Sequence, residues 1–309
     1  MSNLVHTPVL LAEAIAALAP RPSGTYADGT LGAGGHAAAI LKASAPTGRL
    51  YGCDRDPSAI EVATNRLAEF AGRFELRVSS YTGLAEWLGP ERCDGVILDL
   101  GVSSMQIDDP ERGFSFQSDG PIDMRMDRSQ TFTAAHLVNE ASAGELARIF
   151  WEFGGERQSH RLARAIVQER VHRRIESTRR LAALIERLAP QKRLRIHPAT
   201  RAFQALRIAV NDELGQLRGG LDSAWAVLKP GGRFLVITFH SLEDRIVKEF
   251  GRKLARDYSV EGTEDIPELR RPKRPEMAWV TRKAVQPKDE ETKANPRARS
   301  AQLRVMQKL

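Results

Sequence analysis

The sequence contains few cysteines and no long apolar run. Its two cysteines, Cys53 and Cys93, each lie in or beside an apolar, strand-like stretch, which is typical of reduced core thiols rather than of a disulfide framework or a metal cluster. No apolar run approaches the roughly 20 residues that a membrane-spanning helix requires, and the first residues lack the basic and apolar regions of a signal peptide. We therefore expect a soluble, cytoplasmic protein without a membrane partner.

Internal repeats and metal-binding motifs are also missing. Asp119, Asp123 and Asp127 recur four residues apart, but proline and methionine interrupt the run, and no histidine or glycine spacing resembles a calcium loop. We expect an ordered loop at these aspartates and no bound metal.

Positive charge is present in excess and unevenly distributed. The chain has 309 residues, which is long enough for one large core and a smaller lobe, and its 42% hydrophobic content is typical of a globular protein. Its net charge is +7. Residues 157–207 hold 14 Lys and Arg against 3 Asp and Glu, and residues 270–304 hold 11 against 4. Such asymmetry indicates a polyanionic partner. The alternative is a solvated helix face followed by a mobile basic tail.

Short apolar segments predict a parallel sheet. Four of them, separated by helical stretches, start about 20 to 25 residues apart, as βαβ units do. A fifth strand is expected at 233–238 after a Lys-Pro-Gly-Gly turn, and two further candidates lie at 278–280 and 302–305. The pattern predicts an α/β fold with a doubly wound, mostly parallel, Rossmann-like sheet. The first four predicted strands are 25–28, 50–53, 74–78 and 95–98.

The alternation breaks after Asp99, where an inserted helical domain is expected. A loop over 101–130 is followed by helical patterns at 157–174 and 181–188, and by one long amphipathic helix that starts at Pro198 and continues through Leu221. We therefore predict a discontinuous sheet domain, 1–110 and 209–309, and a basic, all-helical insertion at 111–208.

A glycine loop follows the first predicted strand. It reads DGTLGAGGH at 28–36, so its backbone N–H groups can approach a ligand closely. Asp54 ends the next strand and can grip a ribose, whereas Asp56, before Pro57, is the expected helix cap. The loop alone leaves NAD, S-adenosylmethionine and a purely structural turn all open.

Two further segments end predicted strands and can act on a substrate. Asp99 lies at the carboxyl end of the fourth strand, where a carboxylate and nearby carbonyl groups could hold the N–H groups of an exocyclic amine during methyl transfer. The alternative is that Asp99 caps its own loop. After the fifth strand, Ser241 and Asp244 have capping-box spacing, which leaves His240 as either a site member or a packed loop histidine.

Eight blocks together resemble one known family over nearly the whole chain. They closely resemble the family of ribosomal RNA small subunit methyltransferase H, also called the MraW or RsmH family. The blocks are HTPVLL (6–11), the glycine loop (28–36), DLGVSS (99–104), RGFSF (112–116), DMRMD (123–127), HPATR (197–201), NDEL (211–214) and FHSLEDR (239–245).

The resemblance implies a function and a set of site residues. Members are S-adenosylmethionine-dependent methyltransferases with a doubly wound catalytic domain and a helical insertion, and they methylate N4 of one cytidine in the decoding region of 16S rRNA. The implied partner is the small-subunit rRNA or the assembled subunit, and a homodimer is compatible with the family. The implied catalytic residues are Asp99, Ser103 and His240; the implied cofactor contacts are Gly34, Gly35, His36, Asp54, Tyr81, Asp99 and Gln106.

The chain departs from the family pattern at two positions, and three other functions have to be weighed. Tyr81 stands where members often carry Phe, and Met105 replaces a small residue or proline. The glycine loop also permits an NAD-dependent dehydrogenase, and the charge pattern permits a non-catalytic RNA-binding or assembly protein. A DNA amino-methyltransferase shares the chemistry, but the loop after the fourth strand lacks its usual Pro-Pro-aromatic sequence.

Overall fold

The chain forms two compact units. A computed structural model describes residues 8–188, 197–261 and 265–309. The first unit comprises Met1–Gly101 and Leu214–Leu309, and the second is Val102–Glu213. The boundaries therefore lie at 101/102 and 213/214, whereas the sequence pattern indicates 110/111 and 208/209. The first two residues of the block at 6–11 and residues 189–196 of the basic segment lie outside the described part.

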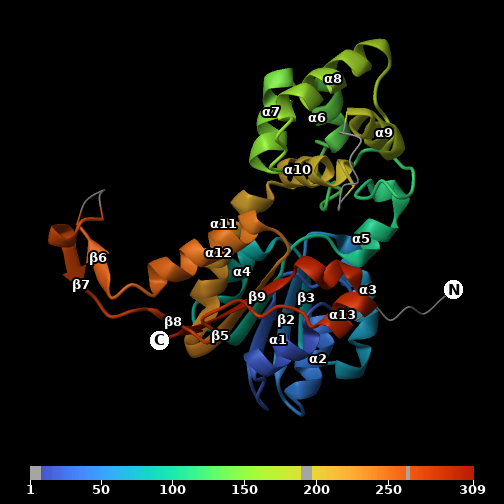
Figure 1. The fold of residues 1–309 in the computed structure, drawn as a ribbon. Coiled ribbons are helices and arrows are strands. Elements are labelled where there is room, and N and C mark those ends of the chain that lie inside the picture. The colour runs from blue at the N-terminus through green and yellow to red at the C-terminus, as the bar shows by residue number, and fades with distance from the viewer. Residues whose placement is uncertain (1–7, 189–196, 262–264) are drawn as a thin grey trace. The chain divides into compact units, whose positions relative to one another are not determined.

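A seven-stranded sheet with helices on both faces organises the first unit (Figure 1). The strand order is β3-β2-β1-β4-β5-β9-β8; the first five strands are parallel, and β9 and β8 run antiparallel. This confirms the predicted doubly wound, mostly parallel sheet. The order reverses between β1 and β4, so a ligand crevice is expected at their carboxyl ends. The strands are β1 Thr25–Asp28, β2 Arg49–Asp54, β3 Phe74–Val78, β4 Cys93–Asp99, β5 Leu228–Thr238, β8 Met277–Trp279 and β9 Gln302–Lys308.

Two apolar layers cover the sheet because successive strand residues point to opposite faces. Leu235 and Ile237 of β5 pack with α1, α2 and α3, whereas Phe234 and Val236 pack with α11 and α12. The helices of this unit are α1 Leu11–Leu18, α2 Gly35–Ala43, α3 Pro57–Arg66, α4 Leu84–Leu88, α11 Glu213–Val227, α12 Ser241–Leu254 and α13 Asp289–Ala294. Short elements add η1 Ala68–Phe70, η2 Tyr81–Gly83, η4 Pro267–Leu269, η5 Pro296–Ser300, and the ribbon of β6 Tyr258–Val260 with β7 Arg270–Pro272.

The second unit is built from helices around its own core. Buried side chains such as Leu146, Phe150, Ile166 and Phe203 form one apolar cluster. The helices are α5 Ser104–Asp108, η3 Pro110–Arg112, α6 Ala134–Glu140, α7 Ala143–Glu152, α8 Ser159–His172, α9 Thr178–Leu188 and α10 Ala199–Asn211. Among the described residues of this unit, β structure is limited to one isolated bridge, Pro121 with Ser177.

The long helix predicted from Pro198 through Leu221 is wrong, because the structure divides it. α10 ends at Asn211, Asp212 has a left-handed backbone (φ 46°), and α11 starts at Glu213. The Asn211 side chain accepts a hydrogen bond from the Met126 amide (2.8 Å) and donates one to the Met124 carbonyl (2.7 Å). The apolar periodicity of the sequence continues across the break, so periodicity alone could not reveal it.

The basic tail of the alternative interpretation has regular structure where the structure describes it. Residues 270–304 contribute β7, β8, α13, η5 and most of β9. The Leu10 amide donates a hydrogen bond to Glu291 Oε1 (2.7 Å), which ties α13 to the start of α1. Over the described ranges, no helix is both long and apolar enough to cross a membrane.

Candidate active site

Contacts with Asp54 and Pro8 hold the glycine loop between β1 and α2 in place. Asp54 Oδ2 accepts a hydrogen bond from the Gly32 amide (2.8 Å), and Oδ1 accepts one from the Asp56 amide (2.9 Å). Gly34 has φ 74°, and a Cβ on Gly35 would lie 2.2 Å from Pro8 Cγ. No side chain caps α2, so the amides at its start are available to an anionic group. Asp56 caps α3 by accepting from the Ser58 amide, as predicted.

His36 has its side chain turned away from the loop. The ring is buried, and Nε2 lies 3.1 Å from the Val9 carbonyl oxygen, to which it donates. Burial lowers the pKa of His36 to about 4, so the ring is neutral at ordinary pH. The imidazole is engaged with Val9, and only the backbone of His36 can serve as a ligand contact.

Four carboxyl groups meet at the carboxyl edge of the sheet. Asp28, Asp54 and Asp99 end β1, β2 and β4, and Glu243 lies in the first turn of α12. Burial, reinforced by the charge of Asp54, raises the pKa of Asp28 to about 7. Burial, with the charges of Asp28 and Glu243, raises the pKa of Asp99 well above its ordinary value.

One oxygen of the Asp99 carboxylate has no hydrogen-bonding partner among the described residues. The buried Oδ1 accepts no hydrogen bond from any of them, so this oxygen does not cap the loop. The backbone amide of Asp99 instead donates to Thr30 Oγ1 (2.6 Å). A buried, unsatisfied carboxylate is costly by itself and favours a ligand that brings N–H donors or positive charge.

The acidic crevice fits S-adenosylmethionine better than a dinucleotide. S-adenosylmethionine carries positive charge on its sulfonium and amino groups, which carboxylates attract, whereas the pyrophosphate of NAD would be repelled by them. The residues present therefore fit the sulfonium cofactor, and the amides at the start of α2 can receive its carboxylate.

Tyr81 is the first residue of η2, the short turn that comes after β3. Its ring lies against α11, where a Cβ on Gly220 would come within 2.1 Å of the ring. Ser80 caps this turn by accepting from the Thr82 amide, and its hydroxyl donates to Gln216 Oε1 (2.9 Å). Tyr81 is thus held at the carboxyl edge of the sheet.

His240, not Ser241, is the N-cap of α12. His240 Nδ1 accepts from the Glu243 amide (3.4 Å), and Glu243 Oε2 accepts from the amides of Phe239 (2.8 Å) and His240 (3.2 Å). The predicted Ser241–Asp244 box is wrong because Asp244 is held by Arg304 (2.6 Å) and Lys248 (3.0 Å).

The capping hydrogen bond also determines which nitrogen of the neutral His240 ring carries the hydrogen. Because Nδ1 accepts, Nε2 carries the hydrogen of the neutral ring. Nε2 lies 3.3 Å from Glu243 Oε1 but has no hydrogen bond of acceptable geometry to any described residue. His240 can therefore donate a hydrogen bond to a bound ligand.

Ser103 and Gln106 belong to the second unit, where they form the capping box of α5. Ser103 Oγ accepts from the Gln106 amide (3.3 Å), and Gln106 Oε1 accepts from the Ser103 amide (3.1 Å). The Ser-x-x-Gln spacing is itself a capping-box signal. A chemical role for either side chain stays a prediction from the family resemblance.

Sequence reasoning missed Asp28, Thr30 and Glu243 as parts of the site. Asp28 is the last residue of β1, and that position could have identified it, as it identified Asp54 and Asp99. Glu243 could have been found by testing His-x-x-Glu as well as Ser-x-x-Asp for a cap. No signal in the sequence indicates the hydrogen bond that the Asp99 amide donates to Thr30 Oγ1.

Comparison with known proteins gives one consistent family. The protein-family model described as "MraW methylase family" matches residues 3–309. A protein named ribosomal RNA small subunit methyltransferase H from Symbiobacterium thermophilum is 50% identical, with 98% of this chain and 96% of the relative covered. The protein of the same name from Citrifermentans bemidjiense is 49% identical, with both chains covered completely. The structure of an rRNA methylase from Streptococcus thermophilus gives a TM-score of 0.45 at 11% identity and covers 99% of each chain.

Proposed function

The chain belongs to the MraW methylase family, and from this premise we propose that it methylates N4 of a cytidine in the decoding region of 16S rRNA. The methyl donor is S-adenosylmethionine. The observation that carries the proposal is the Asp99 carboxylate, whose buried Oδ1 accepts no hydrogen bond from the described residues, beside Asp28 and Glu243. The relatives' shared name supports small-subunit rRNA as the substrate, and such a substrate places the enzyme in the cytoplasm.

The glycine loop and its neighbours hold the cofactor. The backbone amides of Gly34, Gly35 and His36 would hold its carboxylate, Asp54 would hold its ribose, and the Tyr81 ring would stack near its adenine. When bound, S-adenosylmethionine supplies a methyl group that is activated by attachment to a sulfonium centre. The acidic crevice favours this positive charge over a neutral product.

Asp99 and His240 hold the acceptor base. The positive charge of bound S-adenosylmethionine would favour the ionised form of Asp99 against its raised pKa. The ionised carboxylate would then accept the amine N–H groups, which turns the nitrogen lone pair out of conjugation with the ring. The Nε2–H of His240 donates to a ring acceptor. The amine nitrogen would receive its methyl group from bound S-adenosylmethionine, and the surplus N–H proton would then pass to Asp99 or to water. Positioning accounts for most of the rate enhancement.

The helical unit provides a basic surface for the RNA backbone. Arg174 pairs with Glu140, and Arg180 donates to Glu169 and to the carbonyls of Arg173 and Arg174. These arginines are partly committed to the fold. The side chains of the exposed Arg173 and Arg179 form no ion pair with any described carboxylate, so they are the better candidates for phosphate contacts.

The test combines methyl transfer with one conservative substitution. The protein is incubated with labelled S-adenosylmethionine and either naked 16S rRNA or small subunits, and the modified nucleotide is mapped. We expect label on one cytidine N4 and, for Asp99→Asn, a fall in kcat of about 100-fold, because the amide cannot accept both amine protons.

The exposed Asp222, on α11, gives a matched control, since Asp222→Asn makes the same chemical change outside the crevice. It should methylate like the unaltered protein. Full activity of Asp99→Asn would remove the catalytic assignment and would favour an RNA-binding or assembly role. Binding of NAD instead of S-adenosylmethionine in calorimetry would favour the dehydrogenase.

A further inference from the structure

A cavity in the first unit is lined mostly by cations and lies outside the crevice described above. Its volume is about 430 Å³. Side chains from α12, β8, β9 and the segment after β8 surround it, and five of them are basic: Lys248, Arg252, Arg282, Lys283 and Arg304. Trp279 and Gln302 also line it. None of these residues belongs to the cofactor or catalytic set.

The strand register places Gln302, which lines the cavity, at the same edge of the sheet as the carboxylates. Arg304 pairs with Val236 and Gln302 pairs with Thr238, the last residue of β5. β5 in turn pairs with β4, on which Asp99 faces Ile237. β9 is therefore two strand spacings, or roughly 10 Å, from the strand that carries Asp99.

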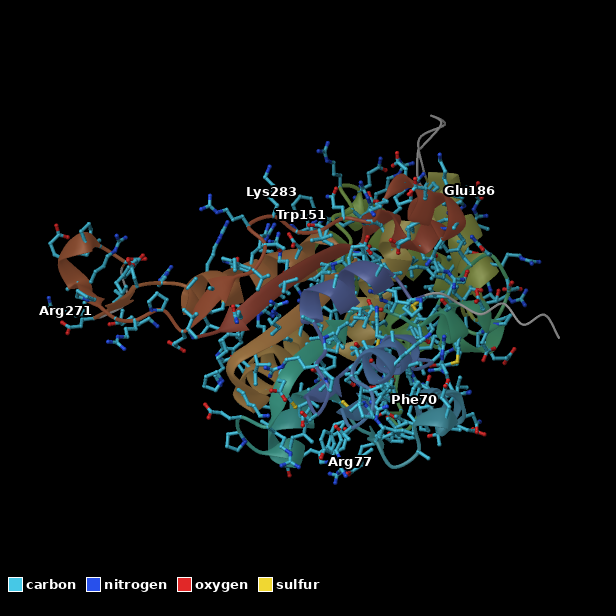
Figure 2. All side chains as sticks on the ribbon, turned by 90° about the horizontal axis from the view of Figure 1, so that it is seen from below. Phe70, Arg77, Trp151, Glu186, Arg271 and Lys283 are labelled. Atoms are coloured by element: carbon cyan, nitrogen blue, oxygen red, sulfur yellow. The ribbon has the colours of Figure 1, made fainter. Side chains whose placement is uncertain are left out.

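The cavity has a net positive charge. Arg304 and Lys248 share a single carboxylate, that of Asp244. Arg252, Arg282 and Lys283 are exposed and form no ion pair with any described carboxylate. Figure 2 labels Lys283 in a stretch where several nitrogen-tipped side chains extend from the ribbon.

The aromatic wall of the cavity is fixed in place. The Trp279 ring packs against α12, where a Cβ on Gly251 would come within 2.3 Å of the indole. The Arg304 guanidinium lies over the same ring, 5.9 Å from its centroid. Arg304 therefore lies on a side of the cavity that packs against Trp279, whereas the cations on the other side are exposed.

We propose that this cavity binds a backbone phosphate of the RNA substrate, next to the nucleotide that enters the crevice. The inference rests on the proposed function. The acidic side chains of Asp28, Asp54, Asp99 and Glu243 offer a phosphate no cationic partner, so a nucleotide whose base reaches Asp99 needs a cationic place for its phosphate nearby. The cavity provides that place, and Lys and Arg side chains suit phosphate oxygens.

The test compares two pairs of substitutions that remove the same charge. Arg282→Gln/Lys283→Gln alters the exposed side of the cavity. Lys42→Gln/Arg49→Gln alters exposed cations at the end of α2 and the start of β2, at the opposite edge of the sheet. Binding of naked 16S rRNA is measured over a range of salt concentrations, together with KM and kcat for methylation and the Kd for S-adenosylmethionine.

We expect the cavity pair to lower the slope of log K against log salt by about 0.7 to 0.9 for each phosphate that the protein no longer neutralises. KM for the RNA should rise, while kcat and the Kd for S-adenosylmethionine stay unchanged. The control pair should keep the original slope. An unchanged slope for the cavity pair overturns the inference, and so does an equal fall for both pairs, which reports only net charge. If the unaltered protein methylates no rRNA, the proposed function itself fails.

Discussion

Asp28 is a residue whose ionisation opposes folding. Its side chain is buried, and its pKa of about 7 lies above the ordinary 3.8. The folded state therefore binds a proton more tightly than the unfolded chain, and stability falls as pH rises from about 4 to about 7. Above pH 7 the full penalty is present, at most about 4 kcal/mol. A cation bound in the crevice would offset it.

Replacing Asp28 by Asn should therefore stabilise the cofactor-free protein at high pH. Denaturant unfolding of Asp28→Asn should show a free energy of unfolding higher by about 2 to 4 kcal/mol at pH 8, with the gain vanishing near pH 4. Calorimetry should show weaker binding of S-adenosylmethionine. The exposed control Asp222→Asn should change stability little at either pH. A gain that is equal at pH 4 and pH 8 would contradict the assignment of the raised pKa to Asp28.

At the scale of elements, local signals predicted strands well and helix ends less well. The bounds predicted for β1 and β3 agree with the structure, because short apolar runs flanked by turn residues mark both ends. The N-cap of α12 is His240, one residue before the predicted Ser241. Both Ser-x-x-Asp and His-x-x-Glu have the right spacing, and the choice depends on Arg304, which holds Asp244 from β9. A contact across 60 residues cannot be read from local spacing.

The cap and the chemistry of His240 can be separated by two substitutions. His240→Ala should lower the free energy of unfolding by about 1 kcal/mol, because the Glu243 amide would then have no side-chain acceptor. His240→Asn should retain that stability, since Asn caps helices well. Both variants lack Nε2–H, so both should transfer methyl groups about tenfold more slowly, as expected for the removal of one hydrogen bond. Full activity in His240→Asn would mean that His240 acts only by positioning the start of α12.

At the scale of the whole molecule, acidic and basic side chains are concentrated in different parts of the fold. Carboxylates gather at the carboxyl ends of β1, β2 and β4, and cations gather around the α12 and β9 cavity and on the helical unit. The sequence predicted both basic segments and a polyanionic partner. It could not predict which arginines the fold uses internally, because the pairs of Arg180 and Arg187 with Glu169 form between different helices.

Two separate basic surfaces should contribute separately to RNA binding. Arg173→Gln/Arg179→Gln removes exposed cations of the helical unit, and Arg282→Gln/Lys283→Gln removes those of the cavity. Each pair should lower the salt slope of rRNA binding, and the combined variant should show the sum of the two decreases, because the effects of independent sites add. The Lys42→Gln/Arg49→Gln control shows how much of any change in slope comes from net charge alone. An unchanged slope for the Arg173 and Arg179 pair would exclude that face of the helical unit from the RNA interface. A combined decrease no larger than that of one pair alone would mean that both pairs act on the same phosphates.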